Sequence, residues 1–144
     1  MKFYAGSDHA GFGLKQKLVQ YLLQAGHDVE DLGTRSEASC DYADFAHPVC
    51  TAVLEHSETF GLLICGSGIG MSMAANRHAG IRAALCHHSL EARLTREHND
   101  ANVLVLGARI IGDDLAKDIL DAFLRASFSG GRHQQRVKKI EISC

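Results

Sequence analysis

The run Cys65-Gly66-Ser67-Gly68-Ile69-Gly70 holds the residues with the clearest chemical potential. It follows the apolar segment 60–65 and leads into an expected helix. Glycines let main-chain N–H groups gather around an anion, and the N-terminus of a following helix adds positive potential. That potential favours the thiolate form of a cysteine. The run therefore predicts an anion-binding turn, with Cys65 either reactive at its edge or packed beneath it.

The glycine spacing argues against a nucleotide cofactor. The glycines fall as G-x-G-x-G after the expected third strand, whereas a dinucleotide-binding loop has G-x-G-x-x-G after the first, and the lysine of a phosphate-binding P-loop is missing. The nine histidines form neither H-E-x-x-H nor a Cys/His cluster with zinc spacing. We therefore expect neither a nucleotide nor a metal.

Two further polar segments could bind or move protons. Asp8 and His9 follow the first expected strand, and His98-Asn99-Asp100 precedes the fifth. A carboxylate beside an imidazole can bind sugar hydroxyls or phosphate and can transfer protons. Such groups are also ordinary loop residues, so these segments alone leave both interpretations open.

The C-terminal tail carries a pair of arginines. Arg132 and Arg136 are four positions apart, which places them on one face of a helix. Two guanidinium groups on one face suit a phosphate dianion, although a basic tail is more often a solvated surface. The tail follows the turn-forming run 129–131, so it could reach a neighbouring subunit.

Short apolar runs alternate with amphipathic segments along the whole chain. Strands are expected at 3–5, 29–32, 60–65, 81–86 and 103–106, and helices at 13–25, 42–55, from 69 onward, 89–98 and 113–126. Pro48 would lie in the first turns of the second helix. The pattern predicts one α/β domain over residues 1–144, a three-layer Rossmann-like fold with a five-stranded parallel sheet and a C-terminal helical tail from residue 130. Ligands of such sheets bind at the carboxyl ends of the strands, where we expect residues 7–9, 65–71 and 98–99 to gather.

The composition excludes some classes of binding partner. The formal net charge is −2, with no tryptophan and few other aromatic residues, so neither nucleic acid nor an anionic membrane is an expected partner. The longest apolar runs are too short to span a bilayer.

The five cysteines are odd in number and lack C-x-x-C spacing, and the first residues lack the apolar core of a signal peptide. These features favour the cytoplasm.

Taken in order, these residues resemble the ribose-5-phosphate isomerase B family, within a group that includes galactose-6-phosphate isomerase subunits. The likeness runs nearly from end to end. It rests on Ser7-Asp8-His9-Ala10-Gly11-Phe12, Asp41-Tyr42, Cys65-Gly66-Ser67-Gly68-Ile69-Gly70, Ala74-Ala75-Asn76, Gly80-Ile81-Arg82-Ala83, Arg96-Glu97-His98-Asn99-Asp100-Ala101-Asn102 and Gly130-Gly131-Arg132-His133-Gln134-Gln135-Arg136-Val137.

The resemblance implies an aldose–ketose isomerase of the pentose phosphate pathway that acts on a small sugar phosphate without metal or organic cofactor. It also implies a homodimer or a dimer of dimers whose sites lie between two subunits. Cys65 matches the family's catalytic cysteine. One branch uses a glutamate six residues later, where this chain has Met71, so the chain resembles the cysteine-base branch.

By the same resemblance, His98 assists ring opening and Asp8 handles hydroxyl protons. Ser67 retains the hydroxyl of a threonine common in that branch and is counted with the catalytic residues. The amides of Gly66, Gly68 and Gly70 would stabilise the enediolate oxygen. The remaining expected ligands are Tyr42 and Asn99 for the sugar hydroxyls, and His9, Arg109, Arg132 and Arg136 for the phosphate.

Two alternatives stay open. The substrate could be a six-carbon sugar phosphate, such as galactose 6-phosphate or allose 6-phosphate. The chain could instead be a non-catalytic sugar-phosphate-binding module, against which the presence of both Cys65 and His98 weighs. A redox role for Cys65 is disfavoured, because no resolving cysteine is near it in sequence.

Overall fold

The computed structural model describes residues 1–142, which form five strands and six helices. In chain order they are β1 (Lys2–Ser7), α1 (Phe12–Gln24), β2 (Asp28–Asp31), α2 (Ala43–Glu55), β3 (Thr59–Cys65), α3 (Ile69–Ala75), β4 (Ala83–Leu85), α4 (Ser89–Asn99), β5 (Val103–Gly107), α5 (Asp113–Arg125) and α6 (Arg132–Lys138). The alternation of strand and helix confirms the expected α/β Rossmann-like fold.

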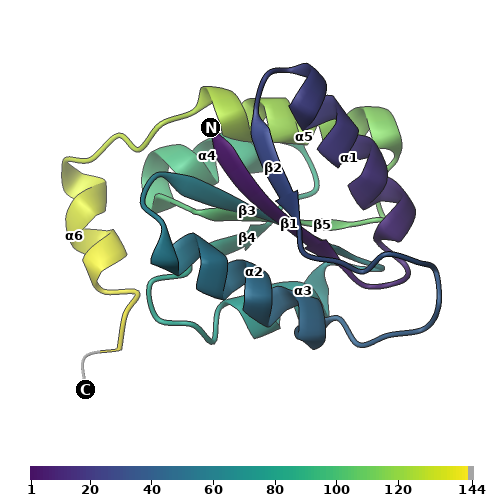
Figure 1. Cartoon of the computed structure of the whole chain (residues 1–144). Coiled ribbons are helices and arrows are strands. Elements are labelled where there is room, and N and C mark those ends of the chain that lie inside the picture. The colour runs from purple at the N-terminus through teal and green to yellow at the C-terminus, as the bar shows by residue number, and fades with distance from the viewer. Residues whose placement is uncertain (143–144) are drawn as a thin grey trace.

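The five strands make one parallel sheet in the order β2-β1-β3-β5-β4. Helices α1, α4 and α5 cover one face, and α2 and α3 cover the other (Figure 1). Helix α6 stands apart, beyond the end of the sheet where the strands begin (Figure 1). We call this end the amino edge and the opposite end, where the strands finish, the carboxyl edge.

The sheet's core follows the alternation of side chains along β3. Leu62 and Ile64 pack under α1 and α5, whereas Leu63 and Cys65 face α2 and α3. The three aliphatic side chains are fully buried. Burial of each contributes about 1.5–3 kcal/mol, so this central strand is a rigid platform for whatever its carboxyl end carries.

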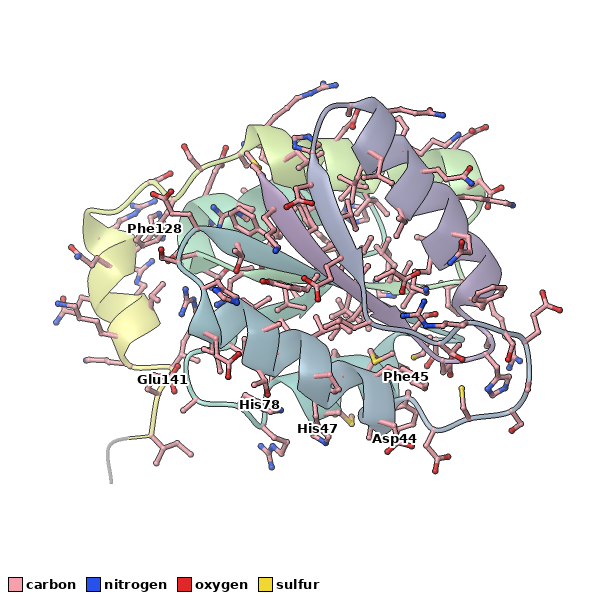
Figure 2. The ribbon with its side chains drawn as sticks, viewed as in Figure 1. Asp44, Phe45, His47, His78, Phe128 and Glu141 are labelled. Atoms are coloured by element: carbon pink, nitrogen blue, oxygen red, sulfur yellow. The ribbon has the colours of Figure 1, made fainter. Side chains whose placement is uncertain are left out.

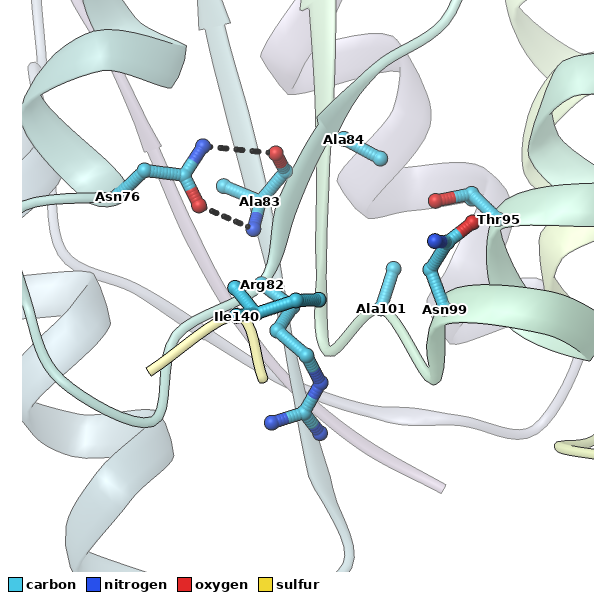
Figure 3. Close-up of a pocket in the computed structure, with 8 residues that line it drawn as sticks. All are labelled: Asn76, Arg82, Ala83, Ala84, Thr95, Asn99, Ala101 and Ile140. Atoms are coloured by element: carbon cyan, nitrogen blue, oxygen red, sulfur yellow. Dashed lines mark hydrogen bonds between the residues drawn. The ribbon is translucent and has the colours of Figure 1, made fainter. Parts of the chain in front are cut away.

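Strand β4 is shorter than expected. It spans Ala83–Leu85, so the predicted strand 81–86 was too long. It lies at the edge of the sheet, where hydrogen bonding to β5 is available on one side alone. On its other side the Asn76 amide donates to the Ala83 carbonyl and accepts from the Ala83 N–H, both at 2.9 Å (Figure 3).

Helix α2 begins at Ala43 and continues through Pro48. Proline supplies no N–H to the preceding turn, which weakens a helix. Val49, Cys50 and Val53 are buried on the helix's inner face, and this packing keeps the segment helical. None of the helices within residues 1–142 is long and apolar enough to cross a membrane.

Candidate active site

The turn after β3 places a sulfur beside a backbone donor. Cys65 ends the strand with 4% of its surface exposed, and its Sγ accepts a hydrogen bond from the Gly68 N–H at 3.1 Å. Gly68 has a φ of +77°, and a β-carbon there would stand 2.4 Å from Leu85 Cδ1. The turn therefore requires glycine at this position, both for its backbone conformation and for space.

Ser67 and Gly66 complete the turn. Ser67 Oγ accepts from the Ile69 N–H at 3.2 Å, at the start of α3. The Gly66 carbonyl accepts from the Arg109 N–H at 2.9 Å, which fastens the loop after β5 to the turn. The Arg109 side chain lies across Gly66, about 3.5 Å from where a β-carbon would be, which is an ordinary van der Waals distance.

The loop after β1 contributes a carboxylate and an imidazole. Asp8 is 7% exposed, and its Oδ1 accepts from the Gly11 N–H at 2.9 Å, just before α1. His9 Nδ1 lies 3.2 Å from both the backbone N and O of Cys40. These contacts hold one ring nitrogen of His9 and leave Nε2 available to a ligand.

Most of the expected site residues line one cavity of about 350 Å³ at the carboxyl edge. They are Asp8, His9, Tyr42, Cys65, Gly66, Ser67, Gly70 and Arg109. Gly68 directs its N–H to the sulfur instead. Ala10 and Ile110 also line the cavity. They were not expected because apolar side chains carry no chemical signal, although each adjoins a residue that was. A cavity of this size suits a small polar molecule.

His98 and Asn99 do not lie at this cavity within one chain, so the expectation that they gather with Cys65 was wrong. Both precede β5, and a residue that precedes a strand lies at the amino edge. The five residues of β5 separate the two edges by about 16 Å. Asn99 lines a different pocket, beside Arg82 and Ala83 of the β4 region (Figure 3).

His98 belongs to a basic cluster with the tail helix. Its ring stacks on that of His133, with centroids 4.3 Å apart and planes 5° from parallel. Arg132 and Arg136 are exposed on the same helix, α6. Burial, the adjacent His98 and the two arginines lower the pKa of His133. The cluster is cationic and lies at the amino edge, where it cannot reach the same chain's cavity.

The other described cysteines have different surroundings. Cys50 and Cys86 are buried, and burial raises the pKa of each to about 12. Cys40, Cys50, Cys65 and Cys86 are free thiols, and Cys144 lies outside the described residues. Within residues 1–142, no group of three or more His, Cys, Asp or Glu side chains is placed to hold a metal ion.

Comparison with known proteins decides the family. Residues 3–140 match the family model described as Ribose/Galactose Isomerase. The chain belongs to the ribose/galactose isomerase family. Among curated relatives, ribose-5-phosphate isomerase B of Escherichia coli strain K12 is 49% identical over 139 residues, covering 96% of this chain and 93% of that protein.

Solved structures of ribose/galactose isomerases share the fold. A ribose 5-phosphate isomerase from Thermotoga maritima superposes with a TM-score of 0.94 at 54% identity, covering 96% of each chain. Ribose-5-phosphate isomerase B from Mycoplasma genitalium, solved with bound ribulose-5-phosphate, has a TM-score of 0.93 at 42% identity, covering 96% of this chain and 93% of that one. The protein described here is thus an isomerase with the architecture of these enzymes.

Proposed function

We propose that this isomerase interconverts ribose 5-phosphate and ribulose 5-phosphate through an enediolate, with Cys65 as the base. The observation that carries the proposal is the position of the Cys65 sulfur, which borders the cavity and accepts the Gly68 N–H at 3.1 Å. A hydrogen bond from a backbone amide stabilises a thiolate. Relatives named for ribose 5-phosphate, at up to 54% identity among those compared, support the choice of substrate.

The proton transfer follows from these groups. In the open-chain aldose, the Cys65 thiolate takes the proton from C2, and the C–H electron pair forms the C1–C2 double bond while the carbonyl π electrons move to oxygen. A proton then passes from the O2 hydroxyl to O1, a transfer we assign to Asp8, and a carbonyl forms at C2 as C1 takes the carbon-bound proton back from the thiol. One base thus serves both half-reactions without a net change. Amide groups of Gly66 and Gly70 are the donors we assign to the developing oxyanion.

Binding groups surround that centre. We assign Asp8, Ser67 and Tyr42 to the sugar hydroxyls and His9 and Arg109 to the phosphate. A phosphate held at the far end of the cavity would position the reacting carbons, because binding energy there can be used to orient the substrate. Arg109 and His9 approach the cavity from separate loops, after β5 and β1 respectively.

A complete site needs a second copy of the chain. We propose a homodimer, or a dimer of dimers, in which the partner's basic cluster of His98, Arg132 and Arg136, together with Asn99, covers the cavity. Two observations support this arrangement. The cluster cannot reach the cavity of its own chain, and the apolar side chains of Ile69 and Met73 on α3 and of Ile110 at the cavity are 51%, 66% and 58% exposed. Ring opening by His98 would then occur across the interface. The free thiols support a cytoplasmic enzyme.

The decisive experiment compares Cys65→Ala with Cys50→Ala. Cys50 is also a buried thiol on the α2 and α3 face, but it does not line the cavity. We expect Cys65→Ala to lose isomerisation while still binding a substrate analogue, and Cys50→Ala to retain turnover. Near-normal turnover in Cys65→Ala would reject the assigned base.

The same purified protein should be assayed on five-carbon and six-carbon sugar phosphates. A preference for allose 6-phosphate or galactose 6-phosphate would replace the proposed substrate and leave the role of Cys65 intact. Binding without turnover of any of these sugars by the wild-type protein would instead indicate a sugar-phosphate-binding module.

A further inference from the structure

Two histidines outside the candidate active site face each other on the molecular surface. His47 lies on α2 and His78 follows α3, and Figure 2 shows them side by side. Nδ1 of His47 and Nε2 of His78 are 2.8 Å apart, and the ring centroids are 5.0 Å apart. His47 is exposed and His78 is partly exposed, so solvent ions can reach the pair. Neither residue lines the candidate cavity.

The backbone on both sides of the pair is held in place. His47 is inside α2. The His78 N–H donates to the Ala75 carbonyl at 3.2 Å, and the His78 carbonyl accepts from the Ile81 N–H at 3.0 Å. The Cys50 thiol lies 3.9 Å from the Ala75 carbonyl and so connects α2 to α3. The fold therefore brings the two imidazoles together before any ligand arrives, which lowers the cost of binding one.

The contact requires one nitrogen without a proton. Two facing ring nitrogens at hydrogen-bond distance can share one proton, so one is a donor and the other presents its lone pair. A neutral imidazole nitrogen is the commonest protein ligand for transition metals. Two such nitrogens converging from two elements make a bidentate ligand.

We propose that His47 and His78 form a surface binding site for a divalent transition metal ion that takes ligands at right angles, Ni²⁺ or Cu²⁺. With metal–nitrogen bonds of about 2.0–2.1 Å, two nitrogens at a right angle lie about 2.9 Å apart, and at the tetrahedral angle about 3.3 Å apart. The observed 2.8 Å is the length of the hydrogen bond between the two rings, and it shows that their nitrogens can approach as closely as the first geometry requires. Tetrahedral Zn²⁺ would require the rings to separate by about 0.5 Å.

Metal binding conserves protons and charge without any reactant other than solvent. The proton shared between the facing nitrogens leaves to solvent, and the ring that held it takes up a proton on its other nitrogen. Both imidazoles stay neutral, each facing nitrogen donates its lone pair to the metal, and water fills the remaining positions. Each ring pivots so that the two lone pairs converge on the ion, a motion open to surface side chains.

Occupancy would connect two elements that begin at the candidate cavity. Helix α2 starts immediately after Tyr42, and α3 starts at the glycine turn beyond Cys65. An ion bound to His47, early in α2, and to His78, just after α3, would hold these elements together and stabilise the native state, because it binds the folded chain and not the unfolded one.

The test is calorimetric titration of the untagged full-length protein with Ni²⁺, which does not oxidise thiols as Cu²⁺ can. We expect one Ni²⁺ site per chain that His47→Ala and His78→Ala each weaken by at least about tenfold, since loss of an outer-sphere partner alone costs about 10–100-fold. His87→Ala removes another exposed histidine, which pairs with Glu91, and should leave the affinity unchanged. Mg²⁺ should not bind the pair.

A second readout guards against misfolded variants. Ni²⁺ should raise the melting temperature of the wild type and of His87→Ala, and should leave that of the His47 and His78 variants unchanged. Unchanged Ni²⁺ affinity in either His47→Ala or His78→Ala overturns the proposal. An equal loss of Ni²⁺ affinity in His87→Ala would also overturn the proposal, because it would place the site elsewhere.

Discussion

The ring of Tyr42 lies against the main chain of Gly70, so closely that a β-carbon on Gly70 would stand 2.6 Å from Cζ of the tyrosine. Tyr42 comes from the loop before α2, and Gly70 from the first turn of α3. The contact forms one wall of the cavity that holds Cys65. The absence of a side chain at Gly70 is therefore what allows the tyrosine to approach the proposed substrate.

Gly70→Ala should displace Tyr42 and lower kcat/KM. A misplacement of about 1 Å in an active site can cost about a hundredfold, so we expect a loss of about 10–100-fold. Gly13→Ala is the matched control, because a β-carbon at Gly13 meets nothing within 4 Å. Alanine in the first turn of α1 should retain activity and stabilise the fold by up to about 1 kcal/mol. Wild-type kinetics in Gly70→Ala would exclude Tyr42 from the site.

Mixing two inactive variants should restore activity if the site is shared. Cys65→Ala removes the proposed base, and His98→Ala removes the partner's proposed ring-opening group. After unfolding and refolding together, half of the dimers would be mixed, and each would hold one intact site, which gives about a quarter of wild-type activity.

The control for this mixture is each variant refolded alone, which should remain inactive. If the mixture is also inactive although mass spectrometry detects mixed dimers, His98 does not complete the partner's site.

Lys15 and Asp31 form an asymmetric ion pair. The Lys15 side chain is fully buried, whereas that of Asp31 is 25% exposed. Removing the carboxylate leaves a buried charge unpaired, so Asp31→Ala should lower the free energy of unfolding by about 3–5 kcal/mol. Asp31→Ala also removes the acceptor of the Gly33 N–H. Lys15→Met should lower the free energy of unfolding by a smaller amount, because the Asp31 carboxylate can still reach water.

Urea unfolding of the two variants measures this difference directly. Equal losses, or a larger loss in Lys15→Met, would show that packing of the lysine stem outweighs the electrostatic asymmetry.

The thiols of Cys50 and Cys86 should make stability fall in alkali. Burial raises the pKa of each from 9.0 to about 12, so the folded state keeps protons that the unfolded state releases above pH 9. Because the folded state raises both pKa values, the stability that the two protonated thiols contribute is complete below pH 9 and is lost progressively toward pH 12. Urea unfolding from pH 8 to pH 10.5 measures the slope. The Cys50→Ala/Cys86→Ala double variant should have a shallower slope, and an identical slope would contradict the burial effect.

The sequence was most informative where structure and chemistry are local. The turn from Cys65 to Gly70 could be predicted because a buried strand, glycines and a helix start follow one another directly. The end of β4 could not be predicted from the sequence, because the length of this strand depends on Asn76 and on the strand order. The position of His98 was misjudged, although its place before β5 already implied the amino edge. The His47–His78 pair joins residues 31 positions apart and has no sequence signal.

The Asn76 amide has a consequence for how copies of the chain can associate. Its pair of hydrogen bonds occupies the outward-facing N–H and C=O of Ala83 in β4, much as a sixth strand would. The opposite border, β2, carries the exposed acidic side chains of Asp28 and Glu30, which discourage another β2 from aligning beside it. Both features disfavour lateral growth of the sheet. In the proposed dimer, the copies would therefore meet through helices and loops, which also carry the proposed catalytic residue and the basic cluster.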